Sequence, residues 1–132
     1  MTHASGNFEV RLTPQTSDGG SDPIVGRLSI DKQFHGELEA TSKGEMLTTG
    51  TTVKGSAGYV AIEQLSGTLK GRTGTFVLQH NGIMDRGTPH LTIAVVPDSG
   101  TGQLAGLTGA MTIKITEGKH FYEFEYKLPE SD

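Results

Sequence analysis

The stretch GTLKGRTGTF, residues 67–76, has the same residue spacing as GQLAGLTGAM, residues 102–111. Both stretches have Gly, Leu, Gly, Thr, Gly and a large apolar residue at the same relative positions. A glycine-rich loop binds phosphate when it leads into a helix N-terminus, where free N–H groups and the helix dipole face the anion. Neither stretch leads into a helical pattern. We therefore interpret the pair as two matched structural corners, where glycine permits positive φ and close backbone approach.

Alternation of apolar and polar residues, the pattern of strands with one buried face, recurs outward from both stretches. No window shows the spacing of three and four that a helix requires, so we expect minimal helix. Residues 57–67 and 74–84 are apolar on both faces, which favours a closed antiparallel β-barrel over a sandwich. The predicted all-β fold has about eight strands, at residues 7–13, 24–34, 37–47, 57–67, 74–84, 90–97, 107–116 and 119–128.

The length and composition favour a single β-barrel domain over residues 1–132. Within it we expect a mobile N-terminus at 1–6, a mobile loop at 14–23 and a C-terminal tail at 129–132. Cysteine is absent, which excludes disulfides, thiolate zinc sites and a cysteine nucleophile. Stability must therefore come from packing and hydrogen bonds.

Charge and hydropathy restrict the partners. Eleven basic and fifteen acidic residues give a net charge of −4, and no basic run indicates nucleic-acid binding. No segment approaches the roughly eighteen apolar residues of a membrane span, and no leader pattern opens the chain. We expect a soluble cytoplasmic protein. Its outer wall carries apolar residues that a homodimer or homotrimer would cover, namely Val60, Ile62, Val77 and Ile83.

Polar residues in register with the apolar strand faces are the candidate site residues. An apolar cavity disfavours a charged carboxylate and raises its pKa, which makes Glu63 the candidate catalytic acid or base and His80 its partner. Tyr59 is assigned to the inner face in preference to Val60. The predicted ligand-binding residues are Ser42, Tyr59, Phe76, Leu78, His120, Tyr122 and Tyr126.

Structural roles for the same residues remain open. Glu63 pairs in that alternative with Arg72 or with a lysine at the barrel rim, His80 is hydrogen-bonded near the mouth, and the tyrosines pack. The histidines are scattered, so we predict no metal site and no cofactor. Serine catalysis lacks the G-x-S-x-G motif.

Several segments together resemble a bacterial family described only as a domain of unknown function, number 3224. They are FHGELEATSKGEM, GYVAIEQLSG, LSGTLKGRTGTFVLQHNGIMD, LTIAVVPDSGTGQLAGLTGAMTI and GKHFYEFEYKL, and the resemblance spans residues 8–128. It implies a small antiparallel barrel similar to that of allene oxide cyclase. It implies no reaction, because a shared barrel does not determine chemistry.

Three functions remain from the sequence. The first is a small-molecule binding barrel with a mostly apolar cavity and a small apolar ligand. The second is an enzyme of the cyclase or isomerase type that uses Glu63 as general acid or base. The third is a structural barrel whose interior is filled by side chains.

Overall fold

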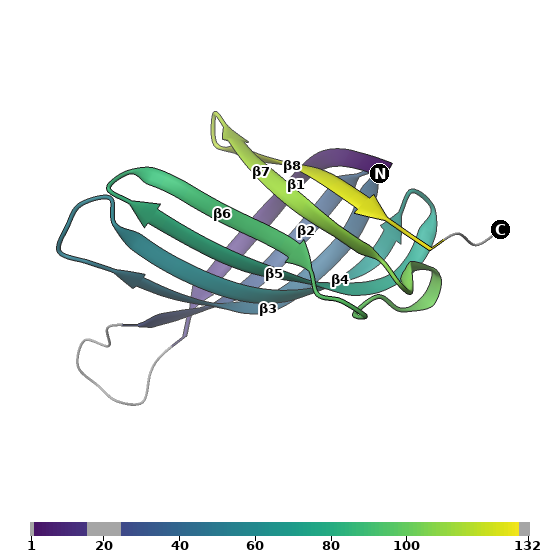
Figure 1. Cartoon of the computed structure of the whole chain (residues 1–132), viewed down its shortest axis with the longest axis horizontal. Helices are drawn as coiled ribbons and strands as arrows, with labels where there is room; N and C mark the ends of the chain where they lie inside the picture. The colour runs from purple at the N-terminus through teal and green to yellow at the C-terminus, as the bar shows by residue number, and fades with distance from the viewer. Residues whose placement is uncertain (1, 16–24, 130–132) are drawn as a thin grey trace.

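The computed structural model describes residues 2–15 and 25–129, which form a closed antiparallel β-barrel (Figure 1). Each strand pairs with the next along the chain, and β1 also pairs with β8. This confirms the predicted all-β barrel of eight strands for the described residues. The strands are β1 (Thr2–Pro14), β2 (Gly26–Gly36), β3 (Leu38–Gly50), β4 (Ala57–Leu69), β5 (Arg72–Asp85), β6 (Thr88–Val95), β7 (Thr108–Thr116) and β8 (Lys119–Lys127), with one turn of 3-10 helix, η1 (Gly102–Leu104).

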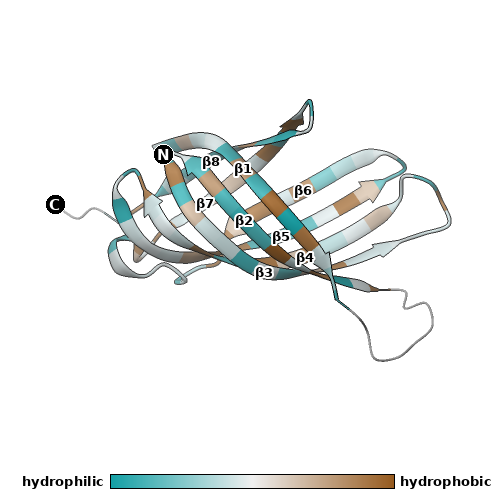
Figure 2. Ribbon diagram, turned by 180° about the vertical axis from the view of Figure 1, so that it is seen from behind, coloured by the Kyte–Doolittle hydropathy of each residue, from teal (hydrophilic) through white to brown (hydrophobic). Residues whose placement is uncertain are grey.

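Alternating burial along the strands separates the interior from the outer wall. On β8, Tyr122 and Phe124 are buried, whereas Glu123 and Glu125 are exposed. Figure 2 shows the same alternation as teal and brown segments along β1. Successive side chains of a strand point to opposite faces, so a strictly alternating sequence places one set inside the barrel.

The two ends of the barrel differ in how they are filled. At the end where β4 turns into β5, a continuous apolar core contains Phe76 and Phe124, whose stacked rings lie 5.9 Å apart. Residues 96–107 run along β5 there, and the backbone N–H of Thr101 donates to the carbonyl of Thr75 at 2.8 Å. Leu104 and Leu107 of this segment are buried in the core. We call this the packed end and the opposite end the open end.

The two glycine stretches meet at the packed end but have different local structures. Residues 67–76 form the β4–β5 hairpin, with positive φ at Lys70 and Gly71, whereas residues 102–111 contain η1 and the entry to β7. The prediction of two matched corners is therefore wrong, because equal spacing does not determine turn type. The close approach is confirmed: a Cβ at Gly102 would lie 2.9 Å from the carbonyl oxygen of Thr73.

The barrel wall is weakest between β6 and β7. Ala94 and Ala110 are the registered pair of this junction, whereas the β4–β5 ladder runs from Ala57 to Leu69. Figure 1 shows the β7–β8 hairpin turning away from β6 beyond that pair. Apolar residues on the inner faces are exposed there, 43% at Leu91 and 64% at Ile115. The open end therefore has an apolar, incompletely paired wall.

The chain ends and loops depart from the predicted domain description at one place. Residues 2–6, predicted as a mobile terminus, form the start of β1 and pair with β8. Ala4 is fully buried, and this ladder holds a segment whose sequence lacks clear alternation. Residues 16–23 of the predicted loop and 130–132 of the tail lie outside the described residues. No helix in the described ranges has the length and apolar character to cross a bilayer.

The outer wall has the apolar residues that the sequence indicates. Val60, Ile62 and Ile83 are exposed on β4 and β5. Val77 is half-buried, because the segment after β6 covers it: its N–H donates to Ser99 Oγ at 3.0 Å. Coverage of the other three residues by further copies of the chain stays a prediction.

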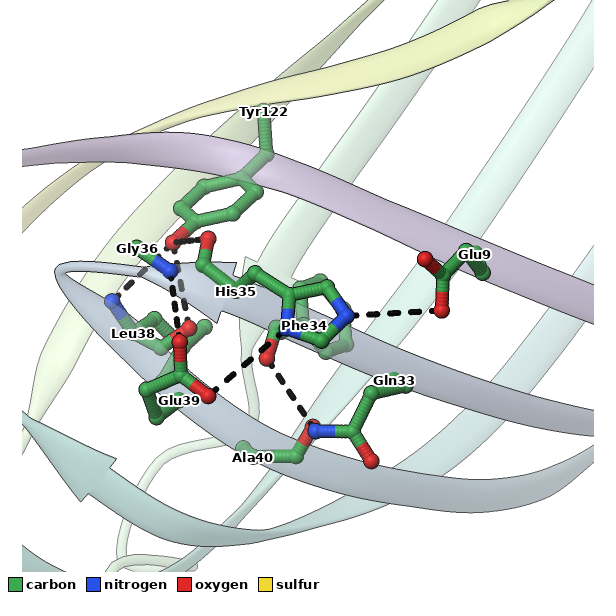
Figure 3. A network of polar contacts seen from close by, with 9 residues as sticks. All are labelled: Glu9, Gln33, Phe34, His35, Gly36, Leu38, Glu39, Ala40 and Tyr122. Carbon is green, nitrogen blue, oxygen red and sulfur yellow. Dashed lines mark hydrogen bonds and ion pairs between the residues drawn. The ribbon is translucent and has the colours of Figure 1, made fainter.

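Tyr122 fixes the connection between β2 and β3 (Figure 3). Its hydroxyl oxygen accepts a hydrogen bond from the backbone N–H of Leu38 at 3.0 Å and donates to the carbonyl of His35 at 2.9 Å. Gly36 turns the chain between these partners with a φ of +110°. The hydroxyl therefore satisfies backbone groups of a tight turn that β8, distant in sequence, packs against.

We expect Tyr122→Phe to lower the free energy of unfolding by about 1–3 kcal/mol, because the buried N–H of Leu38 loses its partner. Urea unfolding measures this. Tyr126→Phe is the matched control, since no other described residue hydrogen-bonds to its hydroxyl, and it should cost clearly less. Equal stability of the Tyr122 variant and the unmodified protein would contradict the role assigned to this hydroxyl.

Candidate functional site

A buried carboxylate, Glu63, lies at the centre of the barrel. Its side chain has no exposed surface. Lys32 Nζ donates to Oε2 at 2.9 Å, His80 Nε2 lies 2.5 Å from the same oxygen, and Ser42 Oγ donates to Oε1. These residues come from β2, β3, β4 and β5, so the closed sheet brings four strands to one point. We call Lys32, Ser42, Glu63 and His80 the polar cluster.

Strand register and one glycine make room for the carboxylate. Glu63 on β4 pairs with Gly44 on β3. A Cβ at position 44 would lie 2.6 Å from the Glu63 Cα, closer than side-chain atoms approach one another. Gly44, on the inner face of β3, therefore permits the close contact of β3 and β4 beside the cluster.

Lys32 is the residue of the cluster that the sequence analysis missed. Its side chain is 7% exposed, and its ammonium lies 4.9 Å from the Phe8 ring centroid and 5.6 Å from that of Phe34. The alternation of β2 could have identified Lys32 as an inward residue, because it lies on the same face as Leu28 and Ile30. Glu63 therefore pairs with a lysine, as the structural alternative predicts, but this lysine is buried inside the barrel and does not lie at the rim, and Arg72 is not the partner.

The pKa of Glu63 shifts opposite to the sequence prediction. Burial by itself raises the pKa of this carboxyl, but hydrogen bonds from His80, Lys32 and Ser42 and the positive charge of Lys32 outweigh burial and lower it to about 2. Glu63 is thus a carboxylate at neutral pH. The prediction of a raised pKa fails because it counted the apolar surroundings without the donors on other strands.

Tyr59 extends the cluster toward the open end. Its hydroxyl lies 3.1 Å from Nδ1 of His80, whose other nitrogen contacts Glu63. Tyr59 is half-buried and Val60 is exposed, which confirms Tyr59 as the inward residue of the pair. A Cβ at Gly82, opposite on β5, would collide with the Tyr59 ring. The missing side chain at position 82 lets the ring lie flat against β5.

A pocket of about 370 Å³ occupies the open end above Tyr59. Tyr59 belongs both to its lining and to the hydrogen-bonded chain that leads to Glu63, whereas the polar cluster lies beneath it. The pocket has few polar groups, and a ligand there meets the cluster through Tyr59. Its lining residues are Met46, Thr48, Thr49, Ala57, Gly58, Tyr59, Gly82, Ile83, Met84, Pro89, His90 and Leu91.

The other predicted site residues lie elsewhere. Phe76, Leu78, Tyr122 and Tyr126 belong to the apolar core toward the packed end. His120 is half-buried, with its ring 5.1 Å from that of Phe8. The structure thus brings together Ser42, Tyr59, Glu63 and His80 of the predicted set, and the remaining five do not line the pocket.

No cluster of three or more histidine, cysteine, aspartate or glutamate side chains that could hold a metal ion occurs in the described ranges. Lys32 and Ser42 only hold the carboxylate in place, whereas His80 and Tyr59 connect it to the pocket by two hydrogen bonds. Such a chain determines which way each hydroxyl and ring nitrogen donates.

Comparison with known proteins gives the family. A family model described as "Protein of unknown function (DUF3224)" matches residues 4–126. The chain belongs to the DUF3224 family. A crystal structure of a DUF3224 protein of unknown function from Shewanella oneidensis MR-1 shares 53% sequence identity, covers 99% of both chains and superimposes with a TM-score of 0.92. Among curated proteins, none matches the chain.

Membership of DUF3224 confirms the resemblance drawn from the sequence and agrees with the barrel. It carries no activity, because both the family and this relative are described as having unknown function. The function of this DUF3224 member must therefore be inferred from its own pocket and polar cluster.

The Glu63 pKa predicts a specific acid sensitivity. A carboxyl lowered from 4.5 to about 2 stabilises the fold fully above pH 4.5 and loses that contribution as the pH falls toward 2. The shift corresponds to about 3 kcal/mol. Urea unfolding between pH 5 and pH 2 should show the unmodified protein losing about 3 kcal/mol more than Glu63→Gln, because the variant lacks this group.

Glu125→Gln, which removes an exposed carboxylate of β8, is the control and should follow the pH dependence of the unmodified protein. Parallel curves for the unmodified protein and Glu63→Gln would show that Glu63 does not have a depressed pKa.

Proposed function

We propose that this protein is a small-molecule binding barrel whose ligand occupies the open end. One observation carries the proposal: a pocket of about 370 Å³ is lined mainly by apolar side chains, and at its base lies a tyrosine hydroxyl held by a buried histidine. Binding sites of small molecules have this composition, with an apolar lining and a few fixed polar groups.

The pocket lining specifies a compact and mostly apolar ligand. Met84, Pro89 and Leu91 supply apolar surface on β5 and β6, and Gly58 and Gly82 leave room beside the Tyr59 ring. Leu91 is 43% exposed, so a ligand that covers it removes apolar surface from water. Among the described residues of the lining there is no aspartate, glutamate, lysine or arginine, and this composition favours an uncharged ligand.

The state of Glu63 supports binding over the cyclase or isomerase alternative. A general acid or base must reach the reacting atoms and exchange a proton near neutral pH. Glu63 is fully buried, does not line the pocket, and has its pKa lowered to about 2 by donors on three strands. These properties suit a fixed anion that orients His80. They do not suit a group that transfers protons to a ligand.

The alternative of a structural barrel filled by side chains fits only one half of the interior. Aromatic and leucine side chains occupy the packed end as one core. The open end retains the pocket, and the residues of its inner wall include exposed Met84 and Leu91. A barrel with a purely structural role would gain stability from larger side chains at these positions.

We expect Leu91→Trp to reduce binding of the uncharged, apolar fluorescent probe N-phenyl-1-naphthylamine by at least about tenfold, because the indole fills the pocket. Fluorescence titration measures the dissociation constant. Ile62→Trp is the matched control: Ile62 is exposed on the outer wall and does not line the pocket, so the probe should bind to this variant as to the unmodified protein.

Two results would contradict the proposal. One is a Leu91→Trp variant that is folded and binds the probe unchanged. The other is loss of probe binding in Ile62→Trp alone, which would place the apolar binding surface on the outer wall.

A further inference from the structure

We infer that the ligand of this pocket presents a hydrogen-bond donor to Tyr59, so that the site selects an alcohol over the ketone of the same skeleton. The inference rests on the proposed binding function and adds the chemical class of the ligand. It follows from the direction of three successive hydrogen bonds, which connect Lys32, Glu63, His80 and Tyr59 in that order.

The contacts of Glu63 with Lys32 and His80 determine that His80 Nε2 is protonated. The Lys32 ammonium has donors and no acceptor, and an ionised carboxylate has acceptors and no donor. Glu63 Oε2 accepts from Lys32 Nζ and lies 2.5 Å from His80 Nε2. At this distance the imidazole must donate, so Nε2 carries a hydrogen.

The charge of the polar cluster determines the state of His80 Nδ1. The positive charge of Lys32 balances the negative charge of Glu63, and both side chains are buried. A second proton on His80 would leave an unbalanced positive charge inside the barrel, which is costly. Among the described residues, no carboxylate besides Glu63 forms an ion pair with His80 or Lys32. Nδ1 therefore keeps its lone pair.

The hydroxyl of Tyr59 has one hydrogen, and His80 Nδ1 takes it at 3.1 Å. Burial, followed by the negative charge of Glu63, raises the pKa of Tyr59, so the phenol keeps this hydrogen at neutral pH. A ligand group that reaches the Tyr59 hydroxyl therefore meets an oxygen lone pair. A ligand hydroxyl can donate to it, whereas a ligand carbonyl oxygen would face it without a hydrogen between them.

The remaining polar groups of the pocket do not reverse this preference. The hydroxyl of Thr48 can donate or accept by rotating, whereas that of Thr49 donates to the carbonyl of Gly50 at 3.3 Å. His90 is exposed on β6, away from the Tyr59–His80 hydrogen bond. Tyr59 is thus the group of the lining whose hydrogen-bond direction is dictated from within the barrel.

Three probes with one bicyclic skeleton test the inference: bornane has no oxygen, borneol has a hydroxyl and camphor a ketone. Each is tested for displacement of N-phenyl-1-naphthylamine from the protein at pH 7.5 in a fluorescence assay. We expect borneol to bind about tenfold tighter than camphor, because one buried hydrogen bond is made in one complex and missed in the other.

Tyr59→Phe should abolish the difference between borneol and camphor while bornane still binds. Tyr126→Phe is the matched control, because Tyr126 lies in the core of the packed end, and it should keep the preference for borneol. Nitrogen-15 NMR of the His80 ring gives a readout that does not depend on a ligand: Nε2 should be protonated and Nδ1 unprotonated at pH 7.5.

The possible failures are distinguishable. Equal or tighter binding of camphor than of borneol, with bornane still bound, overturns the inference and leaves the proposed function standing. A protonated Nδ1 in the NMR spectrum also overturns the inference. If none of the three probes binds and N-phenyl-1-naphthylamine is not displaced, the proposed function fails as well.

Discussion

The interior of this barrel depends on the ion pair between Glu63 and Lys32. A carboxylate without exposed surface is tolerated in an apolar core only when charged and neutral donors surround it. Here the donors come from three further strands, so the ion pair is satisfied only when the sheet has closed with its native register. A shift of one residue in any of these strands would turn a donor to the outer wall.

The polar cluster lies between two halves of the barrel, one filled by side chains and the other partly open. On one side, aromatic and leucine side chains fill the interior, and the segment after β6 pairs along β5 to cover that end. On the other side, β6 and β7 separate beyond Ala94 and Ala110, and the inner wall stays partly uncovered. The apolar packing is concentrated at the packed end, and the ligand that we propose would lie at the open end above Tyr59. The hydrogen bonds from Glu63 through His80 to Tyr59 connect the two halves.

The fold and part of the site could be predicted from the sequence, because both follow from the alternation of apolar and polar residues. Strand faces follow from a period of two, and the same parity places Ser42, Tyr59, Glu63 and His80 on the inside. Lys32 has the same parity, but a lysine near a strand centre is usually solvated, so parity alone does not predict that it is buried. The pKa of Glu63 was predicted in the wrong direction since its donors lie on strands remote in sequence. The weak β6–β7 junction and the differing turns at residues 67–76 and 102–111 depend on tertiary contacts that spacing does not encode.

The ionisation of Glu63 is the most direct measure of this account. Carbon-13 NMR of the Glu63 side-chain carboxyl, followed from pH 7 downward, reports the charge of that one group. If donors on three strands hold the carboxylate, its chemical shift should stay that of an ionised carboxyl until the pH approaches about 2. A carboxyl that takes up its proton at or above pH 4.5 would contradict the buried ion pair on which the division of the barrel rests.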